Sequence, residues 1–155
     1  MALSALPGAL TALLAILRAA DGLHDVLVLD GPPVGDVSTA AFLAVGWSGG
    51  DEGAAEAQQD FNAAGARTRD EEFVITNVID VWDGGEDFEA LRAQAFEILG
   101  VVEQALRATE QAPQAPTLNG TVLWAHLTRM SLRQYFTDQG ARVALGFTVS
   151  CHARI

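Results

Sequence analysis

The first 20 residues carry apolar side chains at the spacing of an α-helix. Leucines recur mostly every three or four positions and form one stripe: Leu3, Leu6, Leu10, Leu13, Leu14 and Leu17. Ser4 is suited to cap the start of this helix, and Pro7 is tolerated because it falls in the first turn. Asp21-Gly22 predicts the end of the helix, with Gly22 in the left-handed conformation that follows a last turn.

A second amphipathic pattern predicts a longer helix over residues 88–106. Its apolar positions share one side: Phe88, Leu91, Ala95, Ile98, Leu99, Val102 and Leu106. Asp83 and Glu86 have the spacing of a capping box before this helix, and Glu86-Asp87 is an alternative start.

The segment between the two helices carries strand patterns. Short apolar runs predict strands over residues 26–30 and 41–47. A longer β signal covers residues 60–82, and residues 61–66 are expected to form the first arm of a hairpin. Residues 48–60 have few strong apolar side chains and no clear period, so they predict a mobile loop.

The C-terminal segment predicts a second hairpin. Two prolines and a terminal Asn-Gly exclude regular structure through residues 110–120. Residues 121–136 then form an extended run, and residues 141–154 alternate cleanly between apolar and polar positions. The turn Asp138-Gln139-Gly140 joins them, with Gly140 suited to a left-handed conformation.

This order of elements predicts a single α+β domain over residues 1–155. A chain of 155 residues suits one hydrophobic core, and half of its residues are apolar. Each helix has one apolar side and must bury it against a sheet. We therefore expect a mixed, mostly antiparallel β-sheet with two α-helices packed on one face, plus extended loops or a β-hairpin.

The chain is acidic, and its charge is unevenly distributed. The formal net charge is −11. Residues 1–112 hold 19 acidic residues against five arginines, whereas residues 113–155 hold one acidic residue against four arginines. Tight binding to DNA phosphates needs a basic surface and is not expected. The asymmetry favours either contacts between acidic and basic surfaces of neighbouring copies or partners, or arginines that only decorate exposed strands.

No pattern in the sequence predicts catalysis. P-loop, dinucleotide-binding, nucleophile-elbow and HExxH motifs are absent from it. Cys151 shares the apolar side of its strand and His152 faces the other side, so the two are not expected to bind one metal ion. The carboxylate pairs Glu71-Glu72 and Glu86-Asp87 are expected to be solvated ends or helix caps. We expect no enzyme activity, no catalytic residue, no metal site and no cofactor.

Residues 1–20 are not expected to enter a membrane. No positively charged segment precedes this apolar run, as it would in a signal peptide. Pro7 interrupts the run, and Arg18 and Asp21 close it, which argues against a transmembrane helix. The single cysteine, Cys151, cannot form an internal disulfide, which is typical of a reducing compartment.

Tryptophans and arginines of the predicted strands are candidates for contacts between subunits. Burial in the core is the default for a tryptophan in a strand, and an interface hot spot is the alternative. The candidate subunit-interface residues are Trp82, Trp124, Arg129, Arg133 and Arg142.

Several segments, taken in order, resemble a known family. They are the leucine-rich first helix, the Gly31-Pro32-Pro33 turn, the stretch Ala63-Ala64-Gly65-Ala66-Arg67-Thr68-Arg69-Asp70-Glu71-Glu72-Phe73-Val74-Ile75, Trp82 with a short acidic turn before the Phe88–Leu106 helix, Leu132-Arg133-Gln134, and the strand from Gly140 to Cys151. This order resembles small tail-completion proteins of long-tailed, siphovirus-like bacteriophages, in particular the tail terminator family. The resemblance covers nearly the whole chain.

The resemblance implies a structural role in the virion. Such a protein would assemble as a homo-oligomer, a hexameric ring, on the last ring of the major tail-tube protein. It would end tube polymerisation and join the tail to the head-side connector or stopper protein, at the head-proximal end of the tail, after synthesis in the host cytoplasm. DNA would pass through without specific binding. Four acidic residues are the candidate lining of the lumen or a solvated loop surface: Asp51, Glu52, Glu56 and Asp60.

Three other functions stay open from the sequence. The chain is also compatible with another head–tail joining protein, with a small enzyme or ligand-binding α+β domain, and with an acidic immunity-type module that binds a basic partner. The second of these needs convergent polar groups in a pocket between helices and sheet, and the apolar helix stripes supply none.

Overall fold

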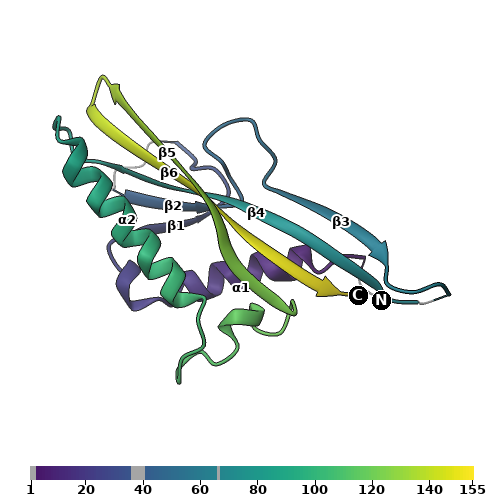
Figure 1. Cartoon of the computed structure of the whole chain (residues 1–155). Helices are drawn as coiled ribbons and strands as arrows, with labels where there is room; N and C mark the ends of the chain where they lie inside the picture. Colours follow the sequence, from purple (N-terminus) through teal and green to yellow (C-terminus); the bar gives the residue numbers. More distant parts are fainter. Residues whose placement is uncertain (1–2, 36–40, 66) are drawn as a thin grey trace.

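The computed structural model describes residues 3–35, 41–65 and 67–155 (Figure 1). Its helices and strands are α1 (Leu6–Arg18), β1 (Leu27–Asp30), β2 (Ala41–Val45), β3 (Ala55–Phe61), β4 (Arg69–Trp82), α2 (Phe88–Ala105), β5 (Trp124–Thr137) and β6 (Gly140–Arg154). Two short 3-10 helices, η1 (Asp21–Leu23) and η2 (Ala115–Thr117), follow α1 and α2.

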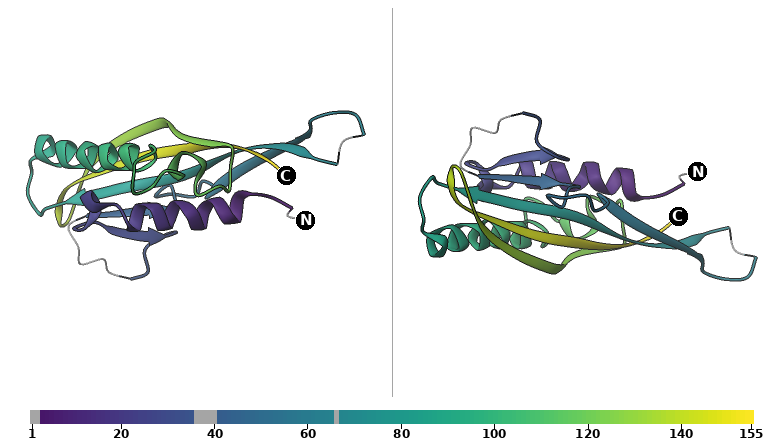
Figure 2. Two further views of the ribbon diagram at one scale, coloured as in Figure 1. Left: turned by 90° about the horizontal axis from the view of Figure 1, so that it is seen from below. Right: turned by 90° about the horizontal axis from the view of Figure 1, so that it is seen from above.

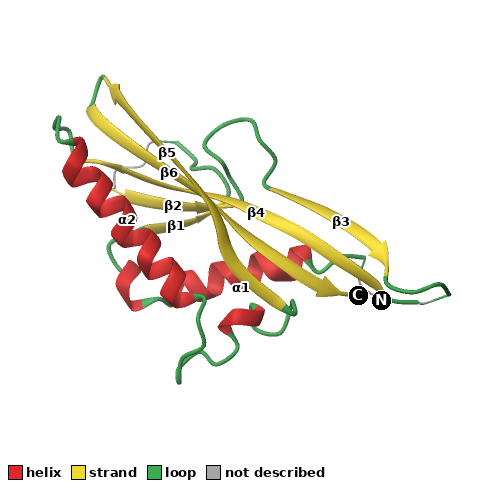
Figure 3. Ribbon diagram, in the orientation of Figure 1, coloured by secondary structure: helices red, strands yellow, loops and turns green. Residues whose placement is uncertain are grey.

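The strands form one sheet around β4 (Figure 3). Their order is β1-β2-β4-β6-β5, and β3 pairs with the N-terminal half of β4. β4 therefore has β3 and β2 in succession along one side and β6 along the other. Only β1 and β2 pair in parallel, and the other described pairs are antiparallel. The predicted α+β class, with a mixed and mostly antiparallel sheet, is confirmed.

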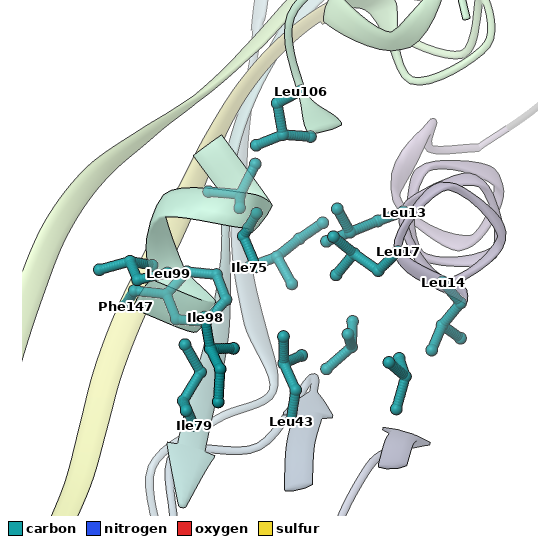
Figure 4. Close-up of a cluster of buried hydrophobic side chains, with 14 of the residues drawn as sticks. Leu13, Leu14, Leu17, Leu43, Ile75, Ile79, Ile98, Leu99, Leu106 and Phe147 are labelled. Atoms are coloured by element: carbon teal, nitrogen blue, oxygen red, sulfur yellow. The ribbon is translucent and has the colours of Figure 1, made fainter. Parts of the chain in front are cut away.

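Both α-helices pack on the same face of the sheet, as the apolar stripes predict. Leu13 and Leu17 of α1 and Ile98 of α2 belong to the same buried cluster as Leu43 and Ile75 of the sheet (Figure 4). The alternation of β4 and β6 produces this core, because alternate side chains of a strand lie on one face. The other face of the sheet is not covered by either helix.

The segment 48–60, expected to be a loop, is partly a strand. β3 pairs with β4 along its whole length, from Ala55 opposite Ile75 to Phe61 opposite Arg69. The first arm of the hairpin thus ends at Phe61 rather than spanning residues 61–66, of which Ala66 lies outside the described residues. The β3–β4 hairpin projects away from the helices (Figure 2). Most side chains of β3 are exposed, which explains why its sequence has no apolar period.

The end of α1 also differs from the prediction. The helix stops at Arg18, and Gly22 lies in η1 instead of a left-handed cap. Close packing explains the glycine there, because a Cβ atom on Gly22 would lie 2.7 Å from a methyl group of Val101 in α2. At the other end, the Ser4 hydroxyl accepts a hydrogen bond from the Leu6 backbone N–H at 3.0 Å.

Other predicted boundaries have mixed outcomes. Asp87 caps α2 by accepting a hydrogen bond from the Ala90 N–H at 3.1 Å, so the alternative start is the one adopted. Residues 110–120 contain the short helix η2, which the two prolines led us to exclude. Gly140 has a φ of 106° in the β5–β6 turn, as the turn predicts.

One carboxylate of β4 lies buried beneath the start of α1. Glu71, expected at a solvated strand end, is fully buried. Its Oε1 accepts a hydrogen bond from the Ala5 N–H at 2.8 Å, and its Oε2 accepts one from the Gln59 amide at 2.6 Å. Burial raises the pKa of Glu71, but the hydrogen bonds from Gln59, Ser4 and Ala5 outweigh it and hold the pKa below its ordinary value. Glu71 therefore ties β3 and β4 to α1.

Replacing this carboxylate should weaken the fold. Glu71→Ala leaves the Ala5 N–H and the Gln59 amide without their acceptor, so we expect the free energy of unfolding to fall by about 2–3 kcal/mol. Urea denaturation followed by tryptophan fluorescence measures this. Glu72→Ala is the matched control, because Glu72 has a side chain that is 76% exposed, and its loss should stay within about 0.5 kcal/mol. Equal effects of the two substitutions would contradict the role of Glu71.

The pH dependence of stability gives a second readout. Because the folded state lowers the pKa of Glu71, its contribution is complete above the ordinary value of 4.5 and is lost as the pH falls through the folded pKa. Glu71→Gln cannot titrate at this position. The stability advantage of the wild type over Glu71→Gln should therefore shrink as the pH is lowered from about 7 to about 3. A constant difference across that range would oppose this assignment.

Candidate functional site

The face of the sheet opposite the helices is the candidate functional site. A small apolar cluster lies at one end of it, formed by Phe42, Ala44, Val78 and Ala144 with Leu29, Trp47 and Trp82 packed against them. The middle is polar: the Thr128 hydroxyl lies 3.1 Å from that of Thr148 and 2.6 Å from that of Ser150. A β-bulge between Leu127 and Arg129 interrupts the pairing of β5 with β6 at this point.

A groove of about 600 Å³ crosses this face between the loop before β3 and strand β5. Acidic residues of the loop and of β3 line one side of it, namely Asp51, Glu52 and Glu56. Arg129 and Arg133 of β5 line the other side. The structure thus brings together five of the residues that the sequence singled out. Asp60 is not among the lining residues and lies farther along β3, opposite Asp70.

Arg142, by contrast, is engaged within the subunit. Its guanidinium donates a hydrogen bond to Asp80 at 2.6 Å and lies 4.4 Å from the ring centre of Trp82. Asp80 is buried, with 7% of its surface exposed. Burial raises the pKa of Asp80 above its ordinary value, although Arg142 acts in the opposite direction. Two of the five candidate interface residues, Trp82 and Arg142, therefore belong to one intramolecular cluster.

Trp124 lies at the other end of the face, in an aromatic stack. Its ring is 4.8 Å from that of His126 and 5.6 Å from that of His152, both nearly parallel to it. His152 also lies 3.8 Å from Asp70 and 3.5 Å from Glu72. Both histidines stack on Trp124, and no group of three or more potential metal ligands comes together within the described residues.

Asp70, at the same end of the open face as Trp124, pairs with Arg154. Its carboxylate accepts a hydrogen bond from the Arg154 guanidinium at 2.9 Å, and this bond lowers the pKa of Asp70 despite partial burial.

Cys151, on the opposite face, is buried among apolar side chains, and burial raises its pKa to about 12. A thiol with this pKa is protonated at neutral pH and is a poor nucleophile.

The edge of the sheet at β5 exposes apolar side chains that the sequence analysis did not single out. Met130, Leu132 and Phe136 are 55%, 40% and 62% exposed, and Phe96 of the neighbouring helix α2 is 42% exposed. At the N-terminal end of α2, Phe88 packs against Phe136 of β5, with their ring centres 4.9 Å apart. The sequence pattern did not reveal this apolar edge because the β-bulge shifts the alternation of β5 by one residue. Apolar side chains after the bulge therefore have the opposite parity from those before it.

A second cavity of about 750 Å³ lies between α1, α2 and the loop that follows α2. Its walls are mostly alanines and uncharged polar side chains, and Asp21 is the one charged residue among those that line it. It offers no pair of groups arranged for acid–base or nucleophilic chemistry among the residues that line it.

Comparison with models of protein families found no match to this chain, and comparison with curated protein sequences found none either. Among the described helices, none has both the length and the apolar character needed to cross a bilayer.

The Asp80–Arg142 pair generates a prediction. Arg142→Ala leaves a buried carboxylate without its cation, so the free energy of unfolding should fall by about 2–4 kcal/mol at neutral pH. A buried acid whose pKa is raised destabilises the fold at neutral pH, and this cost is relieved as the pH falls through the folded pKa. The loss should therefore be smaller at about pH 4 than at about pH 7.

Urea denaturation at both pH values tests this. Arg129→Ala is the matched control, since Arg129 is exposed and makes no ion pair with another residue that the structure describes. Its effect should stay within about 0.5 kcal/mol at either pH. A loss on Arg142→Ala that does not depend on pH would contradict the coupling to Asp80.

Proposed function

We propose that this protein is a structural subunit of a phage tail, a tail terminator that acts as a ring of identical copies. In this role it caps the tail tube, ends tube polymerisation and forms the joint to the head-side connector or stopper protein. Its partners are other copies of itself, the major tail-tube protein and the connector, and its location is the head-proximal end of the tail. It works through surfaces and not through catalysis.

The observation that carries the proposal is the uncovered edge of the sheet at β5. This strand has 14 residues, and most of its side chains are exposed, including the apolar residues Met130, Leu132 and Phe136. A long edge with exposed apolar side chains favours addition of another strand. Such an edge suits a subunit that is completed by its neighbours.

The order of segments that resembles tail terminators and the α+β fold are consistent with this role. The acidic residues Asp51, Glu52, Glu56 and Asp60 are all exposed. Exposed carboxylates on the inner wall of a ring repel phosphate and would let DNA pass without binding. Another head–tail joining protein would share these properties, and the length of the tails distinguishes the two functions.

Two measurements test the proposed function. Size-exclusion chromatography with light scattering should show a closed oligomer, either for the chain alone or once the tail-tube protein encoded by the same genome is added. Electron microscopy of tails assembled without this protein should show overlong tubes, and its addition should restore a uniform length. Tails of normal length in its absence would rule out termination. A chain that stays monomeric with and without tube protein would rule out the ring.

A further inference from the structure

The N-terminal half of β4 belongs to a four-stranded part of the sheet with two free edges. The order there is β3-β4-β6-β5, because the same residues of β4 pair with β3 on one side and with β6 on the other. No further described strand pairs with the outer side of β3 or of β5. One subunit thus offers two unpaired strand edges that face away from each other.

The two edges carry opposite charges on the same face of the sheet. Glu56 and Asp60 of β3 lie opposite Val74 and Asp70, two positions of β4 with the same parity. Arg129 and Arg133 of β5 lie opposite positions of β6 that belong to this same open face. All four charged side chains are exposed, and the Arg133 guanidinium also donates a hydrogen bond to the Ser48 carbonyl of its own subunit at 3.2 Å.

The spacing of the charges also matches. Glu56 and Asp60 are four residues apart, and so are Arg129 and Arg133. In an extended strand, residues four apart point to the same side. Two strands paired with the right register would therefore place both acidic side chains directly opposite both arginines.

We propose that β3 of one copy adds to the β5 edge of the next copy, antiparallel, with Glu56 opposite Arg133 and Asp60 opposite Arg129. This inference rests on the proposed ring and names the contact that would build it. It pairs Glu56 and Asp60 with arginines, so Asp51 and Glu52 are the acidic residues that would remain to repel DNA in the lumen. The contact is heterologous, since each copy uses two different edges, and contacts of this kind generate rings.

The antiparallel direction follows from the fold. Within one subunit β3 runs antiparallel to β4, and β5 runs parallel to β4 because both are antiparallel to β6. β3 and β5 therefore run in opposite directions. Rotation about an axis along the strands preserves direction, so the β3 of the next copy meets β5 antiparallel.

The register requires neighbouring copies to be staggered. Through Val74 of β4, Glu56 lies level with Ser150 of β6. Arg133 lies level with Ala144 of β6, which is six residues away from Ser150 along that strand. Six residues of extended strand correspond to a shift of roughly 20 Å. Strands that close into a barrel are tilted and staggered in this manner. In this register Phe136 comes level with Asp30 of the neighbour's β1, so the tip of the β5–β6 hairpin has to turn away from that strand.

The other face of the added strand matches the apolar side of β5. In this register Ala57 lies opposite Leu132, and Gln59 lies opposite Met130. Ala57 and Leu132 share the helix side of the sheet, because they pair with Phe73 and Leu145 in their own subunits. Phe61, which is 74% exposed, lies at the end of β3 on the same side. Strand addition would thus cover apolar surface that a single copy exposes.

Charge reversal tests the proposal. Arg129→Glu/Arg133→Glu and Glu56→Arg/Asp60→Arg each place two pairs of like charges across the contact, so each should weaken self-association roughly 30-fold. The chain with all four substitutions should associate again, and so should an equimolar mixture of the two double variants. Glu97→Arg/Glu110→Arg changes the net charge by the same amount as the β3 reversal at exposed positions away from both edges, and it should associate like the wild type.

Cysteine pairs test the register. Ala57→Cys/Leu132→Cys should form disulfides between copies under mild oxidation, since the two positions face each other in the antiparallel register. Ala57→Cys/Met130→Cys fits the parallel register and should cross-link weakly. Two intervening strands keep β3 and β5 of one copy too far apart for a disulfide. Cys151 is buried and should add no background.

The outcomes separate this contact from the proposed function. Light scattering, with and without tail-tube protein, measures association of every variant. A wild-type ring that survives both charge reversals would overturn the β3–β5 contact. Efficient cross-linking only in the parallel pair would overturn the antiparallel register. Either result would leave the ring standing. A wild type that stays monomeric in both conditions would overturn the ring and the contact together. Rescue by the fourfold variant and by the mixture is the result that the proposal expects.

Discussion

The pairing of β4 on both of its sides is the constraint on which the rest of the structure depends. β6 follows it from Asp70 to Trp82, while β3 and β2 share its other side. Alternation along the strand fixes both faces at once, because Ile79 enters the core under the helices and Asp80 enters the open face. A slip of one residue would exchange these two side chains, so the hydrophobic core and the polar face specify the same register.

The elements that could be predicted from the sequence are those whose own side chains are divided between core and water. The stripes of α1 and α2 and the alternation of β6 have this property, and their positions follow from it. The side chains of β3 are not divided between core and water in this way. β3 is a strand because it pairs with β4 and because Gln59 hydrogen-bonds to Glu71. Glu71 was misjudged for the same reason: its partners lie in α1 and β3, far from it along the chain.

The residues of the candidate site could be predicted, but their grouping could not. The three candidate arginines, Arg129, Arg133 and Arg142, lie in two adjacent strands, and the sequence does not say which strand is interior. Because β6 lies between β4 and β5, Arg142 finds Asp80 across the pair and stacks on Trp82. Among the described strands, β5 pairs on one side only, so Arg129 and Arg133 lie at the edge of the sheet, where the Arg133 guanidinium donates a hydrogen bond to the Ser48 carbonyl at 3.2 Å. The position of a strand in the sheet thus decides whether its arginine is held inside the subunit, as Arg142 is, or lies at an exposed edge that a partner could reach.

Charge on an edge strand ordinarily protects a protein from pairing with copies of itself. Two edges of opposite charge change this consequence. β5 against β5 would bring arginines together, and β3 against β3 would bring carboxylates together, so symmetric two-fold pairing through either edge is disfavoured. β3 against β5 is the one combination of these edges in which both charge pairs attract. The proposed head-to-tail contact would either close as a ring or continue as a filament. In the proposed ring, the twist and stagger of the sheet would set the rotation from one copy to the next.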